Sequence, residues 1–289
     1  MNKKVLLFGA DSFTGFHLKK HLEILNYEVF GTSVVNRSEY IYCDLLNKDN
    51  IKNVLNKIKP EYIINLAAIS FVAHDDTLDF YKINILGVQN ILDAIVDTEL
   101  RPYKVILPSS AVVYGNTGGV IGEDLLPKPV NHYGISKYGM ELMAENYFDK
   151  INIIISRPFN YTGKMQNISF VIPKIFSAFQ NGEQVVKLGN LDTVREYNDV
   201  RMIADIYAKL MVSDNKGETV NICSGRGYSL QEVIKACEKI FNYKIGIETD
   251  ERFIRKNEIK SLIGSPDKLK KIIGEYKVFS IDEILGSML

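Results

Sequence analysis

Short runs of β-branched and aromatic residues alternate with helical patterns along the first half of the chain. Several of these runs contain little polar alternation, which is typical of strands that are covered on both faces. The stretches between them repeat apolar residues at helical spacing. Parallel strands joined by helices form a doubly wound α/β sheet. The predicted strands are residues 4–8, 28–32, 40–43, 62–67, 103–109 and 151–156, and the predicted helices are residues 13–25, 49–58, 78–97 and 133–148.

The pattern changes after about residue 160. A loop-rich stretch leads into several further elements, and we therefore expect two lobes with a cleft between them. The further predicted helices are residues 170–182, 199–212, 229–241 and 266–273, and the further strands are residues 185–189 and 219–223. The first lobe is predicted to be residues 1–160 with 197–223 returning to it, and the smaller C-terminal lobe, which binds the substrate, to be residues 161–196 and 224–289.

Composition narrows the class of partner. The 35 basic residues equal the 35 acidic residues in number, so no overall field attracts nucleic acid or an anionic membrane. The initial apolar run ends at Asp11, too early for a signal-peptide core, and no stretch reaches the roughly 20 apolar residues of a membrane span. Cys43, Cys223 and Cys237 show no paired spacing, which suits a reduced, cytoplasmic protein. We expect neither a nucleic-acid partner nor a membrane partner.

The first predicted strand ends in the turn GADSFTG, residues 9–15. Gly9 allows backbone angles that other residues resist, and Gly15 lets the next helix pack closely against the sheet. The helix start offers free amide groups and a positive dipole end to a pyrophosphate. Ser12 stands where a third glycine is common, and serine caps helices well. The turn predicts dinucleotide binding, although any strand-to-helix turn of an α/β protein can share these features.

The end of the second predicted strand indicates which dinucleotide binds. An acidic residue at this place usually selects NAD, but GTSVVNR has Ser33 and Arg37 instead. Both side chains suit a 2′-phosphate, so we predict NADP and leave NAD open. The alternative for Arg37 is a solvated loop charge. Asp44, after the third strand, is either an adenine contact or an ordinary turn residue.

Tyr133 and Lys137 are four residues apart and share one face of a predicted helix. A free tyrosine has a pKa near ~10, which is poorly matched to proton transfer at neutral pH. A nearby ammonium, together with the positive nicotinamide of an oxidised cofactor, favours the phenolate and lowers that pKa. The lysine can also hold the nicotinamide ribose. Ser110, at the end of a central predicted strand, completes the candidate catalytic group because its hydroxyl can bind a substrate carbonyl oxygen.

These motifs together resemble those of the extended short-chain dehydrogenases/reductases that act on nucleotide sugars. The matching segments, in chain order, are GADSFTG, NLAA (65–68), SSAVVYG (109–115), YGISK (133–137) and RPFN (157–160). The second half is most similar to GDP-4-keto-6-deoxy-D-mannose reductases and GDP-mannose 4,6-dehydratases. The segments that carry this second likeness are LGNLDTVREYNDV (188–200) and FIRKNEIKSLIGSPDKL (253–269). The resemblance implies a Rossmann fold and a nucleotide-diphosphate sugar as the substrate.

The resemblance also implies the residues of both binding sites. Arg195 and Arg255 are expected to hold the diphosphate, Glu258 to meet the ribose, and Leu188 and Asn190 to lie near the base. The predicted substrate-binding set is Ser70, Ser110, Asn160, Val171, Lys174, Leu188, Asn190, Arg195, Arg255 and Glu258. The predicted cofactor-binding set is Gly9, Asp11, Ser12, Phe13, Thr14, Gly15, Ser33, Arg37, Asp44, Leu45, Leu66, Ala67, Ala68, Asn84, Tyr133, Lys137 and Pro158. No metal site is expected.

The residue at position 112 indicates which of the reactions known in this family the protein can perform. Dehydratase relatives place a glutamate two residues after the catalytic serine or threonine, and Val112 can neither accept nor donate a proton. An epimerase/reductase resembling GDP-fucose synthase needs a cysteine and a histidine as acid and base, and SSAVVYG has no cysteine. The chemistry that remains is hydride transfer at C4 of the sugar.

Two enzymatic outcomes stay open at this point. In the first, NAD(P)H reduces a nucleotide-linked 4-keto-6-deoxy sugar, with GDP favoured, in the biosynthesis of a deoxysugar for surface polysaccharide. In the second, a bound NAD oxidises C4 and returns the hydride to the other face, as in a 4-epimerase. The missing acid after the second strand and the reductase-like second half favour the first. A third alternative is a sensor or scaffold that only binds NADP, which the presence of Ser110, Tyr133 and Lys137 disfavours. By analogy, we expect a homodimer through the helices near 78–97 and 133–148.

Overall fold

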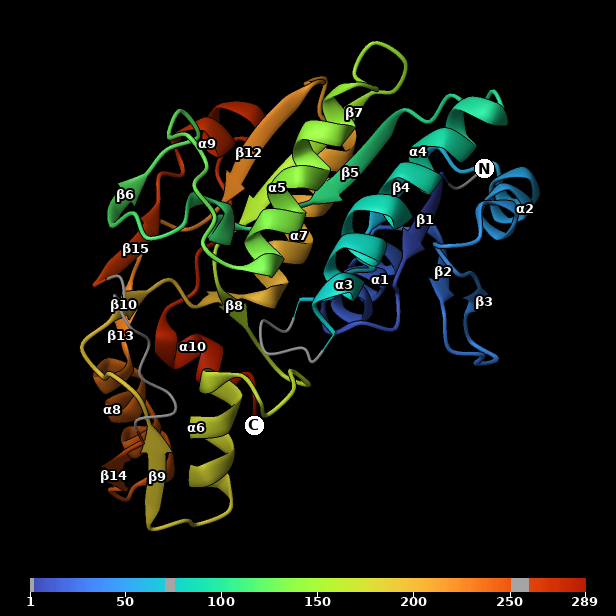
Figure 1. The fold of residues 1–289 in the computed structure, drawn as a ribbon. Helices are drawn as coiled ribbons and strands as arrows, with labels where there is room; N and C mark the ends of the chain where they lie inside the picture. The colour runs from blue at the N-terminus through green and yellow to red at the C-terminus, as the bar shows by residue number, and fades with distance from the viewer. Residues whose placement is uncertain (1–2, 71–75, 251–259) are drawn as a thin grey trace.

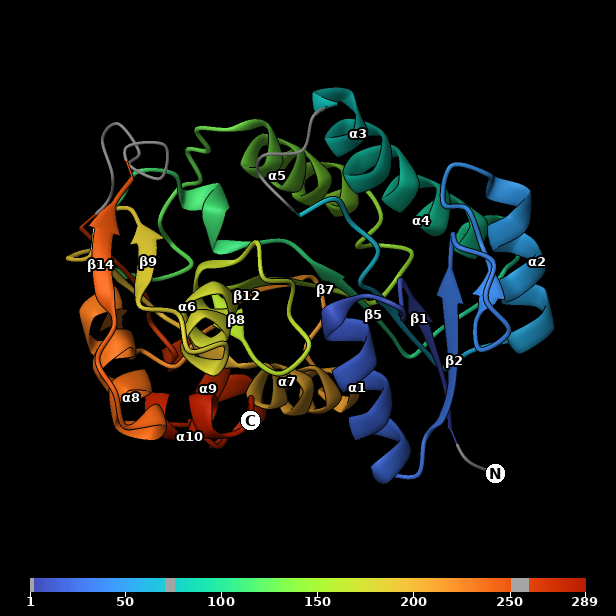
Figure 2. The ribbon, with the colours of Figure 1, turned by 90° about the horizontal axis from the view of Figure 1, so that it is seen from below.

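A parallel sheet of seven strands forms the centre of the molecule, as Figure 1 and Figure 2 show from two sides. The computed structural model describes residues 3–70, 76–250 and 260–289. The strand order is β12-β7-β5-β4-β1-β2-β3, and every neighbouring pair is parallel. The predicted α/β fold with a doubly wound parallel sheet is therefore confirmed. The strands are β1 (Lys4–Phe8), β2 (Glu28–Ser33), β3 (Ile41–Tyr42), β4 (Tyr62–Asn65), β5 (Lys104–Pro108), β7 (Ile153–Pro158) and β12 (Glu218–Ile222).

Helices cover both faces of this sheet. One face carries α1 (Phe13–Ile24), α7 (Val200–Val212) and α9 (Asp267–Ile273), whose apolar residues share one core cluster (Figure 2). The other face carries α2 (Lys48–Ile58), α4 (Val88–Asp97) and α5 (His132–Glu145), which contribute to a second cluster. The central strands β4, β5 and β7 are almost wholly buried between these layers, which explains why their sequences lack polar alternation.

The helix predicted over residues 78–97 consists of three pieces. It begins as α3 (Thr77–Tyr81), continues as the π-helical segment η1 (Lys82–Gly87) and ends as α4. Asn84 lies in the wider π-helical turn and is fully buried. Its side chain accepts a hydrogen bond from the Ile69 amide at 3.0 Å and donates one to the Ile69 carbonyl at 3.1 Å. The irregular turn thus holds the loop that follows β4.

The remaining elements form a smaller assembly beside the main sheet (Figure 1). The helices α6, α8 and α10 pack on their own apolar cluster, and β9 pairs with β14. A second sheet has the strand order β13-β10-β15-β6. The division of the chain into two lobes after residues 160, 196 and 223 stays a prediction. These elements are β6 (Gly119–Ile121), β8 (Tyr161–Thr162), α6 (Val171–Gln180), β9 (Val185–Leu188), β10 (Val194–Arg195), β11 (Asn198–Asp199), β13 (Tyr228–Ser229), α8 (Leu230–Phe241), β14 (Gly246–Thr249), β15 (Ser261–Gly264) and α10 (Ile281–Gly286).

β1 marks the point where the order of the sheet reverses. The chain adds β2 and β3 on one side of β1, and it then crosses to add β4, β5 and β7 on the other side. In open α/β sheets, ligands bind outside the carboxyl ends of the strands at such a point. The loops after β1, β2, β4 and β5 therefore border the expected ligand site. Across the three described stretches, no helix combines the length and the apolar character needed to cross a membrane.

Candidate active site

The turn after β1 leaves no room for side chains at its two glycines. Gly9 has a φ of +71°, and a Cβ atom placed there would lie 2.6 Å from the Ala67 nitrogen. A Cβ atom at Gly15 would lie 2.6 Å from the carbonyl oxygens of Gly9 and Ala10. Ser12 caps α1, because its Oγ accepts a hydrogen bond from the Gly15 amide at 3.1 Å. The bare backbone and the capped helix start fit the pyrophosphate of a dinucleotide.

Phe13 and Thr14 connect this turn to the second half of the chain. The Thr14 hydroxyl lies 2.8 Å from the Tyr161 hydroxyl, and the Phe13 ring stacks on the Tyr161 ring with centroids 6.1 Å apart. Tyr161, at the start of β8, is absent from the predicted site. Its position directly after the RPFN motif is the sequence signal for this contact.

The end of β2 holds a hydrogen-bonded pair. Ser33 is 2% exposed, and its Oγ donates to Oδ2 of Asp11 at 2.6 Å. The same Oγ accepts a hydrogen bond from the Val35 amide at 2.9 Å. Arg37 is exposed on the loop that follows. Both residues are expected to meet a 2′-phosphate, but they differ in exposure: Ser33 is buried, and Arg37 is exposed.

Asp44 and Leu45 form a turn after β3, beside the end of β2. Oδ1 of Asp44 accepts a hydrogen bond from the Leu46 amide at 2.9 Å. Leu45 is buried, and its carbonyl accepts a hydrogen bond from the Asn90 side chain at 2.8 Å. This turn lies next to the loop after β2 because β2 and β3 are paired. Asp44 thus shapes its own turn at the place predicted for an adenine contact.

The predicted residues after β4 lie on a half-buried loop. Leu66, Ala67 and Ala68 belong to it, and Oδ1 of Asn65 accepts a hydrogen bond from the Ala67 amide at 3.2 Å. Asn84 holds the end of this loop and also donates to the Ser136 hydroxyl at 3.0 Å. Its buried amide supports the loop from behind. The last residue of β7, Pro158, is half-buried as well.

Ser110, Tyr133 and Lys137 lie together at the carboxyl end of β5. Ser110 caps the short helix η2 (Ala111–Tyr114), because its Oγ accepts a hydrogen bond from the Val112 amide at 3.2 Å. Tyr133 lies in the first turn of α5, and its hydroxyl is hydrogen-bonded to Ser110. Lys137, one turn later, is 5% exposed, and its Nζ donates to the Pro108 carbonyl at 2.7 Å. The structure brings the three candidate catalytic residues to one place.

Burial governs the protonation of two of these side chains. It raises the pKa of Tyr133 to about 12, and the hydrogen bond with Ser110 opposes this rise. It lowers the pKa of Lys137 to about 8, and the negative charge of Glu141 opposes this fall. In the protein itself the Tyr133 pKa is raised, because burial disfavours the phenolate and the Lys137 ammonium donates to the Pro108 carbonyl. The lowering expected from Lys137 together with an oxidised cofactor stays a prediction. A phenol that keeps its proton is suited to act as an acid.

A buried ion pair links α5, which carries Tyr133 and Lys137, to β7. Glu141, one turn after Lys137 on α5, accepts two hydrogen bonds from Arg157 of β7, with Nε–Oε1 at 3.0 Å and Nη2–Oε2 at 2.6 Å. The Arg157 Nη1 donates to the Tyr114 hydroxyl at 3.0 Å, which in turn donates to Oδ1 of Asn221 at 2.7 Å. All four of these network side chains are buried. None of them is in the predicted site.

This network fixes the relative position of two elements that carry the chemistry. Tyr114 belongs to the helix that Ser110 caps, and Glu141 belongs to the helix that carries Tyr133 and Lys137. Arg157 joins the two from the neighbouring strand. Its sequence signal is an arginine at the end of an apolar strand, since a buried charge needs a partner.

The predicted substrate residues are spread over both parts of the structure. Ser70 and Asn160 are exposed, on the loop after β4 and after β7 respectively. Val171 and Lys174 are half-buried in the first two turns of α6. The Lys174 ammonium donates to the Lys187 carbonyl of β9 at 2.7 Å, which ties α6 to β9.

Three further predicted residues follow along β9 and β10. Leu188 is buried in the apolar cluster of the smaller assembly. Asn190 is exposed and accepts a hydrogen bond from the Asp192 amide at 3.0 Å. Arg195 is half-buried in β10, where its Nη1 donates to the Val194 carbonyl at 2.9 Å. Arg255 and Glu258 lie outside the described residues, so their predicted roles stay predictions.

Glu196, next to Arg195, is a buried carboxylate that the motifs do not single out. It accepts hydrogen bonds from the Ser224 amide at 2.7 Å, the Gly264 amide at 2.7 Å and the Asn198 side chain at 2.8 Å. These partners come from the loop after β12, from β15 and from β11. Glu196 therefore anchors β10, and with it Arg195, to three other segments.

A family model described as GDP-mannose 4,6 dehydratase matches residues 16–288. The chain belongs to this family. Membership in the GDP-mannose 4,6 dehydratase family confirms the resemblance inferred from the motifs, and the protein is an oxidoreductase of the extended short-chain dehydrogenase/reductase type.

Two relatives are similar to this chain over almost its whole length. The GDP-6-deoxy-D-talose 4-dehydrogenase of Aggregatibacter actinomycetemcomitans is 37% identical over 99% of this chain and 96% of the relative. The GDP-6-deoxy-D-mannose reductase of Pseudomonas aeruginosa is 27% identical over 100% of this chain and 97% of the relative.

Two solved structures with the same fold as this chain contain different cofactors, NADPH in one and NAD in the other. RMD from Pseudomonas aeruginosa, complexed with NADPH, has a TM-score of 0.88 and 26% identity, and the match covers 100% of this chain and 96% of that one. The UDP-glucose 4-epimerase of Thermus thermophilus, in complex with NAD, has a TM-score of 0.86 and 20% identity, covering 99% and 98%. The second likeness is one of fold alone.

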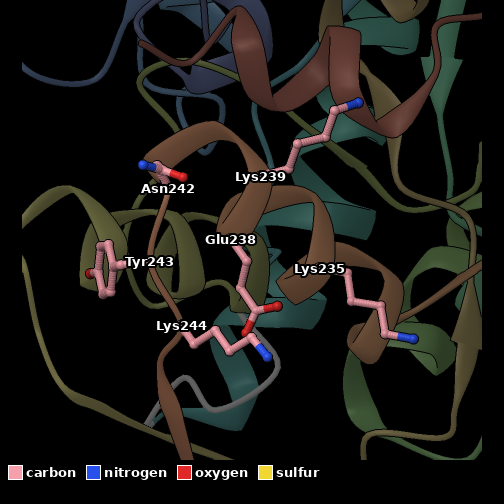
Figure 3. A pocket seen from close by; sticks show the side chains of 6 residues that line it. All are labelled: Lys235, Glu238, Lys239, Asn242, Tyr243 and Lys244. Atoms are coloured by element: carbon pink, nitrogen blue, oxygen red, sulfur yellow. The ribbon is translucent and has the colours of Figure 1, made fainter.

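Two hollows elsewhere on the surface contain none of the predicted site residues. One, of about 740 Å³, lies between α1 and α7 and is lined in part by His17, Lys20 and Phe279. The other, of about 380 Å³, lies at the end of α8 (Figure 3). Figure 3 shows that Lys235 and Lys239 point away from one another. We assign no function to the hollow at the end of α8.

Proposed function

We propose that this protein reduces the C4 ketone of a nucleotide-linked 4-keto-6-deoxy sugar with NAD(P)H. The observation that carries the proposal is the grouping of Tyr133 with Ser110 at the carboxyl end of β5 and with Lys137 one helical turn away on α5. The names of the relatives from Aggregatibacter actinomycetemcomitans and Pseudomonas aeruginosa, which refer to GDP-6-deoxy sugars, support a GDP-linked substrate. The product would be a deoxysugar nucleotide for surface polysaccharide.

The side chains of this chain would perform the acid half of the reaction. A bound reduced nicotinamide would supply the hydride that adds to C4, and the glycine turn would hold the pyrophosphate of the cofactor. Tyr133 donates its phenolic proton to the ketone oxygen, and Ser110 holds that oxygen against the phenol. The Lys137 ammonium binds the cofactor ribose and stabilises the phenolate that remains. The phenolate then regains a proton from solvent, so the net change is one hydride and one proton added to the ketone.

Val112 is the basis for preferring reduction over dehydration. It is half-buried on η2, two residues after Ser110, and the neighbouring Ala111 is buried. Neither side chain can remove a proton from C5 of a sugar or deliver one to a departing C6 hydroxyl. The turn that presents Ser110 therefore offers no acid or base of its own for 4,6-elimination.

A nucleotide-sugar 4-epimerase is the second candidate. The UDP-glucose 4-epimerase of Mycoplasma genitalium is 29% identical over 231 residues, which is 70% of this chain and 67% of that protein. Oxidation and return of hydride at C4 would use the same three side chains. The two candidates differ in the net fate of the cofactor, because an epimerase regenerates it in every cycle.

Cofactor consumption tests the proposal. We expect one equivalent of NAD(P)H to be oxidised for each GDP-4-keto-6-deoxymannose reduced, as followed by nicotinamide absorbance and by chromatography of the sugar nucleotide. UDP- and dTDP-linked keto sugars should react more slowly. Interconversion of a GDP- or UDP-sugar with its C4 epimer, without net oxidation of the cofactor, would establish the epimerase instead.

We also propose that the protein is a cytoplasmic homodimer, paired through the helices near residues 78–97 and 133–148. The pieces α3, η1 and α4 pack beside α5 on one face of the sheet, and four of their apolar side chains are exposed. All three cysteines are free, which supports a reducing compartment. Sedimentation should give the mass of two chains for the wild type, and Leu142→Glu should shift it toward one. The exposed apolar residues are Leu78, Leu86, Ile135 and Leu142.

A further inference from the structure

The larger of the two hollows lies between α1 and α7, on the face of the sheet opposite to α5. The two helices lie side by side on that face (Figure 2). The volume of the hollow is about 740 Å³, and pockets that bind small molecules commonly measure roughly 300 to 1,000 Å³. The hollow is therefore large enough for a small metabolite, and a single inorganic ion would fill only a small part of it.

One outward face of α1 forms a wall of this hollow. His17, Lys20, His21 and Ile24 line it, at the i, i+3, i+4 and i+7 spacing that places side chains on one side of a helix. Three of these side chains carry nitrogen donors. None of the four belongs to the predicted cofactor or substrate residues, so this face of α1 is available for a different ligand.

The whole lining carries an excess of positive charge. It includes five lysine and arginine side chains and three carboxylates, which leaves an excess of two positive charges. Each carboxylate is already bound by a cation. The pairs are Asp199 with Arg201, Asp205 with Lys209, and Glu275 with Lys270, at N–O distances of 2.8, 3.0 and 3.0 Å. The hollow therefore attracts an anion more strongly than a cation.

Two nitrogens on the α1 wall have no hydrogen-bond partner. Lys20 is exposed, and within the described part of the chain it makes neither a hydrogen bond nor an ion pair. Among the described residues, Nε2 of His21 is buried without a hydrogen bond, and it lies 3.7 Å from Oδ1 of Asp205. Buried polar atoms are nearly always hydrogen-bonded, so this exception calls for a group that completes the bond. The oxygens of an anion could accept from both nitrogens.

Apolar side chains form another part of the lining, which includes Ile24, Val200 and Phe279. The Arg201 guanidinium and the Lys277 ammonium each lie 4.4 Å from the centroid of the Phe279 ring. The ring thus holds two cations at the hollow and adds apolar surface beside them. Inorganic phosphate would leave this surface unused, whereas the phosphate ester of an organic molecule would contact both parts of the lining.

We infer that this hollow is a second ligand site, which binds a small phosphomonoester. Lys20 and His21 supply the donors that a phosphate group needs, and Ile24 and Phe279 supply apolar surface for its organic group. The site contains neither the glycine turn nor the candidate catalytic residues, so the inference does not rest on the proposed function.

Calorimetric titration with phenyl phosphate tests the inference, because this probe joins a phosphate to an apolar ring. The protein is first saturated with NADPH and GDP, so that the probe cannot occupy the positions proposed for the dinucleotide and the nucleotide sugar. We expect a dissociation constant of about 1 mM or lower for phenyl phosphate. Inorganic phosphate should bind about tenfold more weakly, because it lacks the apolar group.

Lys20→Met should weaken the binding of phenyl phosphate about tenfold or more, because it removes a charged donor, whereas Lys20→Arg should keep most of the affinity. Lys19→Met is the matched control. Lys19 lies on the same helix and has the same charge, but it pairs with Glu23 at 2.8 Å and does not line the hollow. The affinity of Lys19→Met for phenyl phosphate should equal that of the wild type. Lys20 is exposed, so Lys20→Met should fold normally and keep the melting temperature of the wild type.

A wild-type dissociation constant above about 10 mM would overturn the inference. Equal losses of affinity in Lys20→Met and Lys19→Met would also overturn it, because they would reveal only a general effect of charge. Equal affinities for phenyl phosphate and inorganic phosphate would contradict an organic ligand. The variants locate the bound probe at α1, so none of these results depends on whether the protein reduces a sugar ketone.

Discussion

The two ends of the candidate site are built differently. One end carries the candidate catalytic residues, and we propose that the other end holds the nucleotide sugar. Ser110 and Lys137 are buried, and the network of Glu141 and Arg157 joins their elements from behind. Arg195 is half-buried in a strand of two residues, and Asn190 beside it is exposed. The support for Arg195 comes from backbone amides that bind the neighbouring Glu196.

This contrast follows from the task that each end performs. Proton transfer requires a donor in one position and little competing water, and burial provides both conditions. Recognition of a diphosphate requires donors that remain accessible until the ligand arrives. Substitutions at the catalytic end should therefore change turnover or stability, whereas substitutions at the nucleotide end should change affinity.

The largest effect is expected for Tyr133→Phe. This change removes the proton donor and keeps the ring, so kcat for ketone reduction should fall about 10³-fold, or about 4 kcal/mol in the barrier. Titration with NADPH should show almost unchanged cofactor affinity. Tyr138→Phe is the matched control on α5, since Tyr138 packs against an apolar cluster that includes Val113 and is not one of the candidate catalytic residues. Full activity in Tyr133→Phe would mean that another group is the acid.

Glu141→Gln should give the next largest effect, on stability. It leaves the buried Arg157 guanidinium without a negative partner, which should lower the free energy of unfolding by about 3 kcal/mol in urea titration. Glu145→Gln changes an exposed glutamate on the same helix and should stay within about 0.5 kcal/mol of the wild type. Equal stabilities of the two variants would show that the ion pair does not tie the catalytic end together.

Arg195→Met should affect affinity for the sugar nucleotide. Loss of hydrogen bonds from a charged donor to the diphosphate should raise KM roughly 10- to 100-fold, while kcat changes little. Arg226→Met, on the exposed loop after β12, is the control and should leave KM unchanged. A fall in kcat at constant KM would contradict the assignment of Arg195 to the nucleotide end.

The pH dependence of stability should reveal the buried charge of Lys137. Burial lowers its pKa from the ordinary value of 10.5 to about 8, so between these values the unfolded chain binds the proton more tightly than the folded protein. The contribution of Lys137 to stability is therefore most favourable above pH 10.5 and is lost as the pH falls through 8. As the pH rises from 7 to 10, the free energy of unfolding of the wild type should increase by about 2 kcal/mol relative to that of Lys137→Met. A constant difference across this range would show that the lysine titrates normally.

Local signals in the sequence predict the sheet and the candidate catalytic residues well. The run KVLLF was predicted as a strand over 4–8 and forms β1, because a buried parallel strand needs a continuous apolar run. The strand predicted over 151–156 begins later, at Ile153. Tyr133 and Lys137 were recognisable because helical spacing alone places them one turn apart.

Features that depend on distant partners could not be predicted in this way. β10 and β11 have two residues each and exist through their pairing with β15 and β8, so they leave no periodicity in the sequence. The π-helical turn at Asn84 depends on the buried contact with Ile69. The pairing of Glu141 with Arg157 likewise requires that α5 packs against β7, which no local pattern encodes.

Transfer of deuterium from the nicotinamide to the sugar tests the central claim most directly. NADPH or NADH deuterated at the nicotinamide C4 would be incubated with GDP-4-keto-6-deoxymannose, and the product examined by proton NMR. We predict one deuterium at C4 of the sugar for each cofactor oxidised, and none elsewhere. Deuterium at another carbon, or a product without deuterium, would contradict reduction of the C4 ketone.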